Sequence, residues 1–198
     1  MKYLEVVTHH NTQIVSTADL KEHLRITFTD DDNYIEGLEK AAVHRIEEFC
    51  NIFMLDTALI QYGFTINDLN ILYKSPLLSA DSSATPVIEA PRVQAYVTGA
   101  WTTQTTGIEF IERIKPPRVY VLSSATLLEP DDVFQKWRAV YNVGYKTIAE
   151  IPDPLIQCIK IIVADMYENR QSVIVGKIVS EIPRTAQYLM NPYKIQTL

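Results

Sequence analysis

The feature that most constrains the fold of this chain is a change in the spacing of its apolar residues. Between about residues 16 and 54, and again between about 152 and 191, apolar side chains recur every three or four positions, as on one buried face of an α-helix. Between about 55 and 150 they recur at every second position, as in half-buried β-strands. The sequence therefore predicts an α+β protein, mainly a helical bundle built from both ends of the chain, with a β-rich insertion.

Two helices are predicted in the N-terminal part. Ser16 or Thr17 is expected to cap the first, since either hydroxyl accepts free backbone N–H groups and Asp19 follows Ser16 by three residues. The second begins after three aspartates at 30–32, which we interpret as helix caps, and ends near Asn51. Its apolar stripe consists of Ile35, Leu38, Ala42, Ile46 and Phe49, and its polar outer face is predicted to contain Glu36, Glu39, Lys40, Glu47 and Glu48.

The insertion is predicted to form a mostly antiparallel sheet. Strand patterns occupy residues 57–66, 92–97, 118–122 and 137–145, and in the last of these Trp137, Ala139, Tyr141 and Val143 fall on one face. Segments rich in Ser, Thr, Pro and Asp separate the strands. The longest of these segments, around residues 79–86, is expected to be mobile.

The helical period returns near residue 152. Asp153 is expected to cap a helix that has Pro154 in its first turn, and a non-helical stretch at 172–182 precedes a short last helix. That helix is expected to begin near Pro183 and to stop at Asn191-Pro192. The pattern predicts one domain over residues 1–198, with a helical core at about 16–54 and 152–191, an insertion at about 55–150 and a tail at 192–198.

Charge and hydropathy exclude several classes of protein. Lys and Arg number 18 against 24 Asp and Glu, a formal charge of −6, and no basic run occurs, which disfavours a protein that grips nucleic acid. A weakly acidic wall that DNA slides past remains compatible with this charge. No apolar stretch is long enough to cross a membrane and no signal peptide is evident, so we expect a cytoplasmic protein. Cys50 and Cys158 are expected to be buried thiols.

The sequence contains no recognisable catalytic or metal-binding motif. His9 and His10 are adjacent and point apart, while His23 and His44 have no second ligand one helical turn away. Metal-protease, zinc-ribbon and phosphate-cradling patterns do not occur. We therefore predict no enzyme activity, no cofactor and no metal, and leave open a small-ligand-binding or enzymatic α+β domain whose site is assembled from scattered polar residues.

Several segments together resemble a known family. In order, these are STADLKEHLRI, a helix that ends EEFCN, a β segment that closes with VYNVGY, then IPDPLIQCIKIIVADMYENRQSVIVGKIVSEIP and LMNPYK. This order resembles the phage head-tail connector (adaptor) family, gp6-like and phiE125 gp8-like. The resemblance spans nearly the whole chain and is most specific over residues 143–193, whereas the insertion matches only in its alternation of strands and loops.

This resemblance implies a structural virion protein. The expected subunit joins a homo-oligomeric, dodecameric ring under the portal protein at the head-tail junction, or neck, after assembly in the host cytoplasm. The ring would extend the DNA channel, let DNA pass without specific binding, and present a docking surface to a stopper or tail-completion protein. The order of two helices, insertion and two helices favours the adaptor, while a neck stopper or a tail terminator remains an alternative within the same setting.

Two groups of residues are candidate sites. The tail is expected to be disordered in the free subunit, and its aromatic, basic and aliphatic side chains are hypothesised to bind the portal: Tyr193, Lys194, Ile195 and Leu198. The alternative is a frayed terminus without a role. Acidic residues of the second helix are hypothesised to line the channel, or else to form an ordinary solvated face: Glu36, Glu39, Glu47 and Glu48.

Overall fold

A computed structural model describes residues 3–8, 12–81, 88–112, 116–123, 126–131, 136–170 and 182–195 of the chain. The chain divides into two compact units. The helical unit comprises Asn11–Asn51 and Ile148–Lys194, and the sheet unit comprises Met1–His10, Ile52–Thr147 and Ile195–Leu198. Most of the predicted mobile loop at 79–86 and of the predicted non-helical stretch at 172–182 lies outside the described residues.

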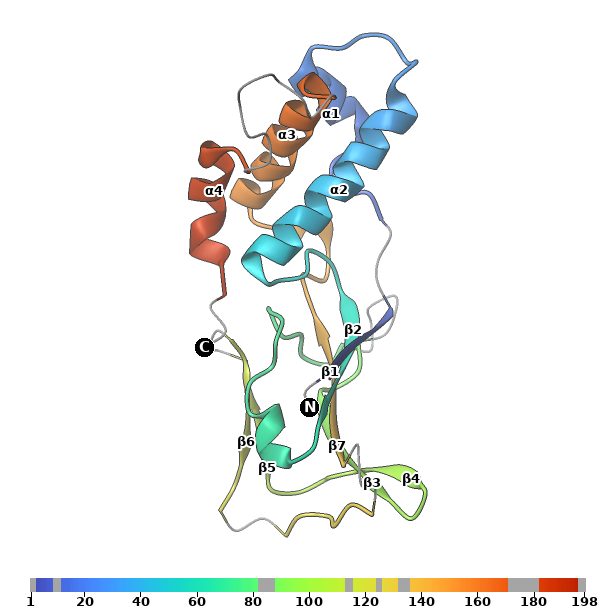
Figure 1. The fold of residues 1–198 in the computed structure, drawn as a ribbon, viewed down its shortest axis with the longest axis vertical. Coiled ribbons are helices and arrows are strands. Elements are labelled where there is room, and N and C mark those ends of the chain that lie inside the picture. The colour runs from blue at the N-terminus through green and yellow to red at the C-terminus, as the bar shows by residue number, and fades with distance from the viewer. Residues whose placement is uncertain are drawn as a thin grey trace. The chain divides into compact units, whose positions relative to one another are not determined.

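The helical unit contains the four predicted helices (Figure 1). The N-terminal pair is α1 (Thr17–Leu24) and α2 (Asp32–Cys50), and the C-terminal pair is α3 (Asp153–Glu168) and α4 (Arg184–Met190). Short 3₁₀ turns, η2 (Ile148–Glu150) and η3 (Asn191–Tyr193), precede α3 and follow α4. Helix α3 contacts each of the other three helices, so the two ends of the chain share one core, as predicted.

The capping residues agree only in part with the prediction. Ser16 caps α1, because its hydroxyl accepts the N–H of Asp19 at 3.1 Å. Asp31 occupies the N-cap position of α2, but its carboxylate makes no capping hydrogen bond, so the predicted role for the aspartates is wrong there. The predicted cap Asp153 is also wrong, since Pro152 holds that position and Asp153 already lies in the first turn of α3, together with Pro154 as predicted.

The sheet unit contains a five-stranded, wholly antiparallel sheet and a separate hairpin. The strand order is β1-β2-β7-β3-β4, so β7, the last strand of the insertion, lies between β2 and β3 (Figure 1). The bounds are β1 Tyr3–Thr8, β2 Thr57–Gly63, β3 Arg92–Val97, β4 Ala100–Thr103, β5 Ile108–Ile111, β6 Arg118–Val121 and β7 Trp137–Val143, with a 3₁₀ turn η1 at Ile66–Leu69.

Strand β1 was not predicted from the sequence. Tyr3–Thr8 pairs antiparallel with β2, with a register irregularity between Val6 and Thr8. The segment YLEVVT does not alternate strictly between polar and apolar residues, so its pattern gave no strand signal. His9 and His10 lie outside the described residues.

One face of the sheet carries the core of this unit. Trp137, Ala139, Tyr141 and Val143 are all buried, which confirms their predicted common face. They pack with Leu59 on β2, with Val93 on β3, and with apolar side chains from η1 and the hairpin. The core face therefore takes up most of the strongly apolar side chains of the central strands.

Buried amide side chains attach irregular segments to this core. Gln61 donates from Nε2 to the carbonyl of Ile71 at 2.9 Å, and its Oε1 accepts from the Tyr73 N–H at 3.3 Å and the Tyr141 hydroxyl at 3.0 Å. Gln104 similarly donates to the carbonyls of Thr106 and Thr126 and accepts the N–H of Leu128. Side chains thus satisfy backbone groups that no neighbouring strand reaches.

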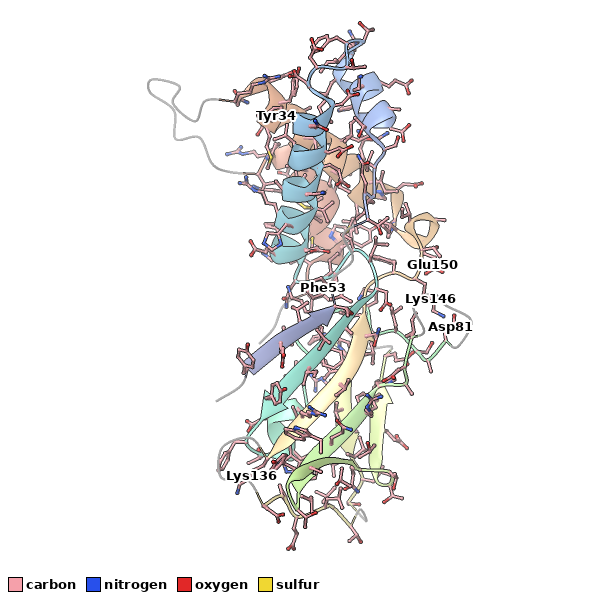
Figure 2. The ribbon with its side chains drawn as sticks, turned by 90° about the vertical axis from the view of Figure 1, so that its right-hand side faces the viewer. Tyr34, Phe53, Asp81, Lys136, Lys146 and Glu150 are labelled. Carbon is pink, nitrogen blue, oxygen red and sulfur yellow. The ribbon has the colours of Figure 1, made fainter. Side chains whose placement is uncertain are left out.

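The start and the end of the inserted segment lie against each other. The N–H of Asp56, before β2, donates to the carbonyl of Tyr145, after β7, at 3.1 Å. Gly144 adopts φ +113°, and a Cβ built there would lie 2.2 Å from the Leu55 carbonyl oxygen, so no other residue fits without moving the backbone. Beyond β7, Lys146 points toward Asp81 and forms an ion pair at 2.9 Å (Figure 2). Across the described ranges, no helix is both long and apolar enough to span a bilayer.

Candidate interaction surfaces

The face of the sheet opposite the core carries a continuous row of side chains. Tyr3 is paired with Tyr62, Tyr62 with Arg138, Arg138 with Gln94, and Gln94 with Thr103. Residues directly opposite each other on antiparallel strands project to the same face, so this row crosses all five strands. We call it the outer row.

Aromatic stacking and hydrogen bonds connect the outer row. The ring centroids of Tyr3 and Tyr62 are 6.0 Å apart, as are those of Tyr62 and Trp101, and the Arg138 guanidinium lies 4.2 Å from the Trp101 ring. Arg138 Nε also donates to Gln94 at 2.8 Å. Aromatic residues and arginine are enriched in protein interfaces because they combine large contact area with directional polar groups.

A hydrogen bond links β1 to β2 on the face of the sheet that carries the outer row. The Tyr62 hydroxyl donates to Glu5 Oε2 at 2.9 Å. Partial burial, followed by this bond to a carboxylate, raises the pKa of Tyr62 above its ordinary value, so the phenol stays protonated and keeps donating. Glu5 is thereby held against the sheet.

Strand β1 itself is exposed along most of its length. Tyr3 is 57% exposed, Val6 47% and Val7 53%. Among the described residues, strand β2 pairs with one edge of β1 and no strand pairs with the other. An unpaired edge with apolar side chains is a surface on which another chain can add a strand.

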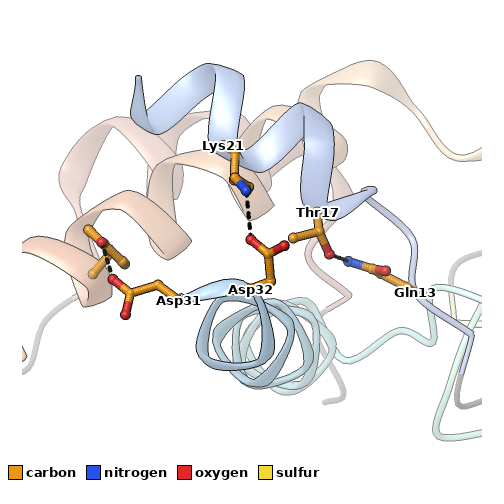
Figure 3. Close-up of polar contacts among 6 residues, drawn as sticks. Gln13, Thr17, Lys21, Asp31 and Asp32 are labelled. Carbon is orange, nitrogen blue, oxygen red and sulfur yellow. Dashed lines mark hydrogen bonds and ion pairs between the residues drawn. The ribbon is translucent and has the colours of Figure 1, made fainter. Parts of the chain in front are cut away.

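In the helical unit, Asp31 and Asp32 at the start of α2 connect this helix to its neighbours (Figure 3). Asp32 accepts from Lys21 Nζ of α1 at 2.7 Å, while Asp31 accepts from the Tyr167 hydroxyl of α3 and pairs with Arg170, each at 2.5 Å. The hydrogen bond from Tyr167, and then that from Arg170, lowers the pKa of Asp31. The Arg170 guanidinium also lies over the rings of Tyr34 and Tyr167. The acidic run therefore connects α2 with α1 and with the end of α3.

The four glutamates proposed as channel-lining residues divide into two pairs. Glu36 and Glu48 are exposed, as expected. Glu39 and Glu47 are only 1% and 3% exposed, so their predicted place on an outer face is wrong. The burial of Glu39 was predictable from the helical spacing, because Glu39 lies four residues after Ile35 and three before Ala42, in the middle of the apolar stripe.

Glu39 has a structural task in the helical unit. Its Oε1 accepts the backbone N–H groups of Ile14 at 2.9 Å and Val15 at 3.3 Å, which holds the segment before α1 against α2. Burial raises the pKa of Glu39, and the two N–H donors and the Lys40 charge offset part of this shift. A carboxylate used in this way is not available to line a channel.

The structure places the candidate tail residues in different surroundings. Tyr193 is half-buried in the turn after α4, and the Lys194 ammonium lies 4.4 Å from the Phe49 ring centroid. Ile195 is only 6% exposed, so the expected disorder of the tail is wrong for residues 193–195. Leu198 lies outside the described residues.

The structure and the predicted cysteine chemistry agree. Both Cys50 and Cys158 are buried free thiols, and burial raises the pKa of each to about 11. Within the described ranges, no group of three or more His, Cys, Asp and Glu side chains is arranged to hold a metal ion.

Residues 15–76 of the chain match the family model of the phage gp6-like head-tail connector protein. The resemblance to the gp6-like connectors is confirmed. A connector is a structural component, so the match also agrees with the prediction of a non-enzymatic protein. The matched residues include α1, α2 and β2.

Solved structures match the fold over nearly the whole chain. A chain in the neck of an empty GTA particle, computed with C6 symmetry, matches with a TM-score of 0.76 and 16% identity, covering 99% of this chain and 97% of that one. A chain in the virion of a native gene transfer agent (GTA) particle gives 0.75 and 15%, with 98% and 96% coverage. A chain in the neck of a native GTA particle, computed with C12 symmetry, gives 0.73 and 15%, with 99% and 97% coverage. Among curated proteins there is no match.

Proposed function

We propose that the chain is a ring-forming subunit of the neck in a tailed phage or phage-derived particle. The ring docks under the portal, extends the DNA channel and presents a surface to a stopper or tail-completion protein. The observation that carries this proposal is the near-complete fold match to a neck chain in a particle computed with C12 symmetry. The gp6-like match over residues 15–76 supports it independently.

The electrostatics suit a channel through which DNA moves. The chain carries a formal charge of −6, and its exposed acidic residues on α2 include Glu36 and Glu48. We retain these two as channel-lining residues and drop Glu39 and Glu47, because they are buried. Negative side chains repel phosphates, so DNA passes without binding to a fixed register.

The C-terminal segment is proposed as the contact with the portal. Tyr193 and Lys194 provide an aromatic and a basic side chain there, and Leu198 provides an aliphatic one. Ile195 takes part only if it leaves its buried position. One segment binds weakly, but the same contact repeated around a ring is reinforced, since each further copy binds at high effective concentration.

The proposal is tested by producing particles without this chain. We expect DNA-filled heads that carry a portal, lack tails and lose DNA, and normal particles when the wild-type chain is supplied in trans. Quantitative mass spectrometry of complemented particles should then find this chain in ring-level copy number, in agreement with the twelvefold symmetry of the matched neck. Normal tailed particles without the chain would refute the proposal.

A second experiment tests the proposed portal contact by deleting residues 193–198. The deletion should reduce retention of the chain on portal-bearing heads, and it should also lower the unfolding temperature somewhat because it removes the buried Ile195 side chain. If the truncated chain is retained as well as the wild type, the segment is dispensable and its assignment to the portal fails, although the neck assignment stands.

A further inference from the structure

Among the described residues, strand β1 ends the sheet with an edge that no other strand pairs with. Edge strands in monomeric proteins are usually blocked by lysine, proline, a bulge or a covering segment, because their free N–H and C=O groups otherwise pair with other chains. The sequence of β1, YLEVVT, has no lysine and no proline. Its single charge, Glu5, is held by Tyr62, and its irregularity comes only at the far end, between Val6 and Thr8. The regular edge from Tyr3 to Val6 is therefore open to pairing.

The side chains of β1 also leave apolar surface exposed on both faces of the sheet. On the core face, Leu4 packs against the core cluster, but Val6, two residues further, is 47% exposed. On the outer face, Tyr3 stacks on Tyr62 from one side and is 57% exposed. A strand added beside β1 would cover apolar surface on both faces while satisfying the free backbone groups.

We infer that β1 pairs, through its free edge, with a neighbouring copy of this chain. The inference rests on the proposed ring function. The matched necks were computed with C6 and C12 symmetry, so copies of a chain recur around an axis and each subunit of such a ring has a copy on either side. A cyclic ring requires a contact between two different surfaces, since a contact between identical surfaces makes a closed dimer. The neighbour's partner segment therefore lies outside its own β1.

The test is site-specific photo-cross-linking from β1. Val7→Cys is suitable, because Val7 is 53% exposed and lies outside the paired register of β1 and β2. Cys50 and Cys158 are buried with pKa values raised to about 11, so a maleimide-benzophenone reagent at neutral pH labels the new thiol selectively. The labelled chain is added to heads that lack this protein and is then irradiated. Leu122→Cys, 44% exposed in the same unit but outside the sheet, is the matched control.

We expect an adduct of two copies of the 22.6 kDa chain from Val7→Cys, with the linked peptide outside residues 1–10, and much less of it from Leu122→Cys. An adduct with another neck protein, an adduct between two copies of β1, an equal yield from the control, or incorporation without an adduct would each overturn the inference. Failure of the unlabelled wild-type chain to enter particles would instead refute the proposed neck function, so the two failures are distinguishable.

A charge variant provides a second measurement. Val7→Lys should reduce ring incorporation roughly tenfold, since a lysine directly beside the Tyr3–Val6 edge opposes the approach of another strand, whereas Leu122→Lys should not. Both variants should unfold at about the temperature of the wild type. Normal incorporation of Val7→Lys would contradict edge pairing.

Discussion

The two units bury polar side chains for different reasons. The described buried polar residues of the helical unit are two carboxylates, Glu39 and Glu47. Those of the sheet unit are mostly neutral: Asp56, Thr57, Gln61, Ser75, Gln94, Gln104 and Asn142. Helices satisfy most of their own backbone groups. In the helical unit, Glu39 therefore accepts hydrogen bonds from the non-helical segment before α1. Short strands and long loops leave backbone groups unpaired, so in the sheet unit amides with both donor and acceptor atoms complete the pairing.

The largest expected effect comes from removing one of these amides. Gln61→Leu leaves the Ile71 carbonyl, the Tyr73 N–H and the Tyr141 hydroxyl without their shared partner, and should lower the free energy of unfolding by about 3 kcal/mol. Urea unfolding measures the loss. The matched control is Gln94→Leu, whose partners Arg138 and Thr103 lie on the solvent face, and it should cost about 1 kcal/mol. Equal losses would show that backbone attachment is not what distinguishes Gln61.

The next effect concerns Glu39 in the helical unit. Glu39→Ala removes the acceptor of the Ile14 and Val15 N–H groups and should destabilise the chain by about 2 kcal/mol. Glu39→Gln keeps an acceptor oxygen and removes a buried charge, so at pH 7 it should be much closer to the wild type. If both variants are equally destabilised, the negative charge rather than the acceptor holds the N-terminal segment.

The pH dependence of the same pair sharpens this distinction. Because burial raises the pKa of Glu39, the folded state holds the proton more tightly than the unfolded state. Relative to Glu39→Gln, the wild type should therefore be most stable below the ordinary glutamate pKa and should lose stability as pH rises through the folded pKa. Urea midpoints of both proteins between pH 4 and 7 give the difference. A difference that is independent of pH would contradict a raised pKa.

The smallest effect is expected at the exposed ion pair of Asp31. The Tyr167 and Arg170 bonds lower the pKa of Asp31, so its contribution is present above the unfolded pKa and is lost as pH falls through the folded value. Asp31→Asn should lower the melting temperature slightly at pH 7, and the difference should vanish at low pH. Asp30→Asn, an exposed neighbour, is the control and should change neither. Solvent screening keeps this effect small.

Elements whose buried apolar residues recur at one regular spacing could be predicted from the sequence. Elements that form only because of partners distant in the chain could not. Helices α2 and α3 and strands β2 and β7 have regular stripes, so their type and faces were predictable. Strand β1 is a strand because β2 lies beside it, and nothing local in YLEVVT indicates this. The same holds for Asp31, whose partners Tyr167 and Arg170 come more than a hundred residues later.

The candidate sites follow the same division. The exposure of Glu36 and Glu48 was predictable from helical spacing, and that spacing also indicated the burial of Glu39. The burial of Ile195 was not predictable, since it depends on where the chain goes after α4. The outer row was missed because it requires the strand order: Tyr3 and Thr103 share it only once β7 is known to lie between β2 and β3.

The contact of Gly144 with Leu55 bears on how such a chain can change during evolution. The start and the end of the inserted segment are joined by the Asp56–Tyr145 hydrogen bond, at a glycine that tolerates no side chain. Because the start and end of this inserted segment are one hydrogen bond apart, the segment can lengthen its loops or lose its hairpin without altering the distance between its two ends. Among related chains we therefore expect the sequence between the two ends to diverge fastest, with the glycine at their crossing retained.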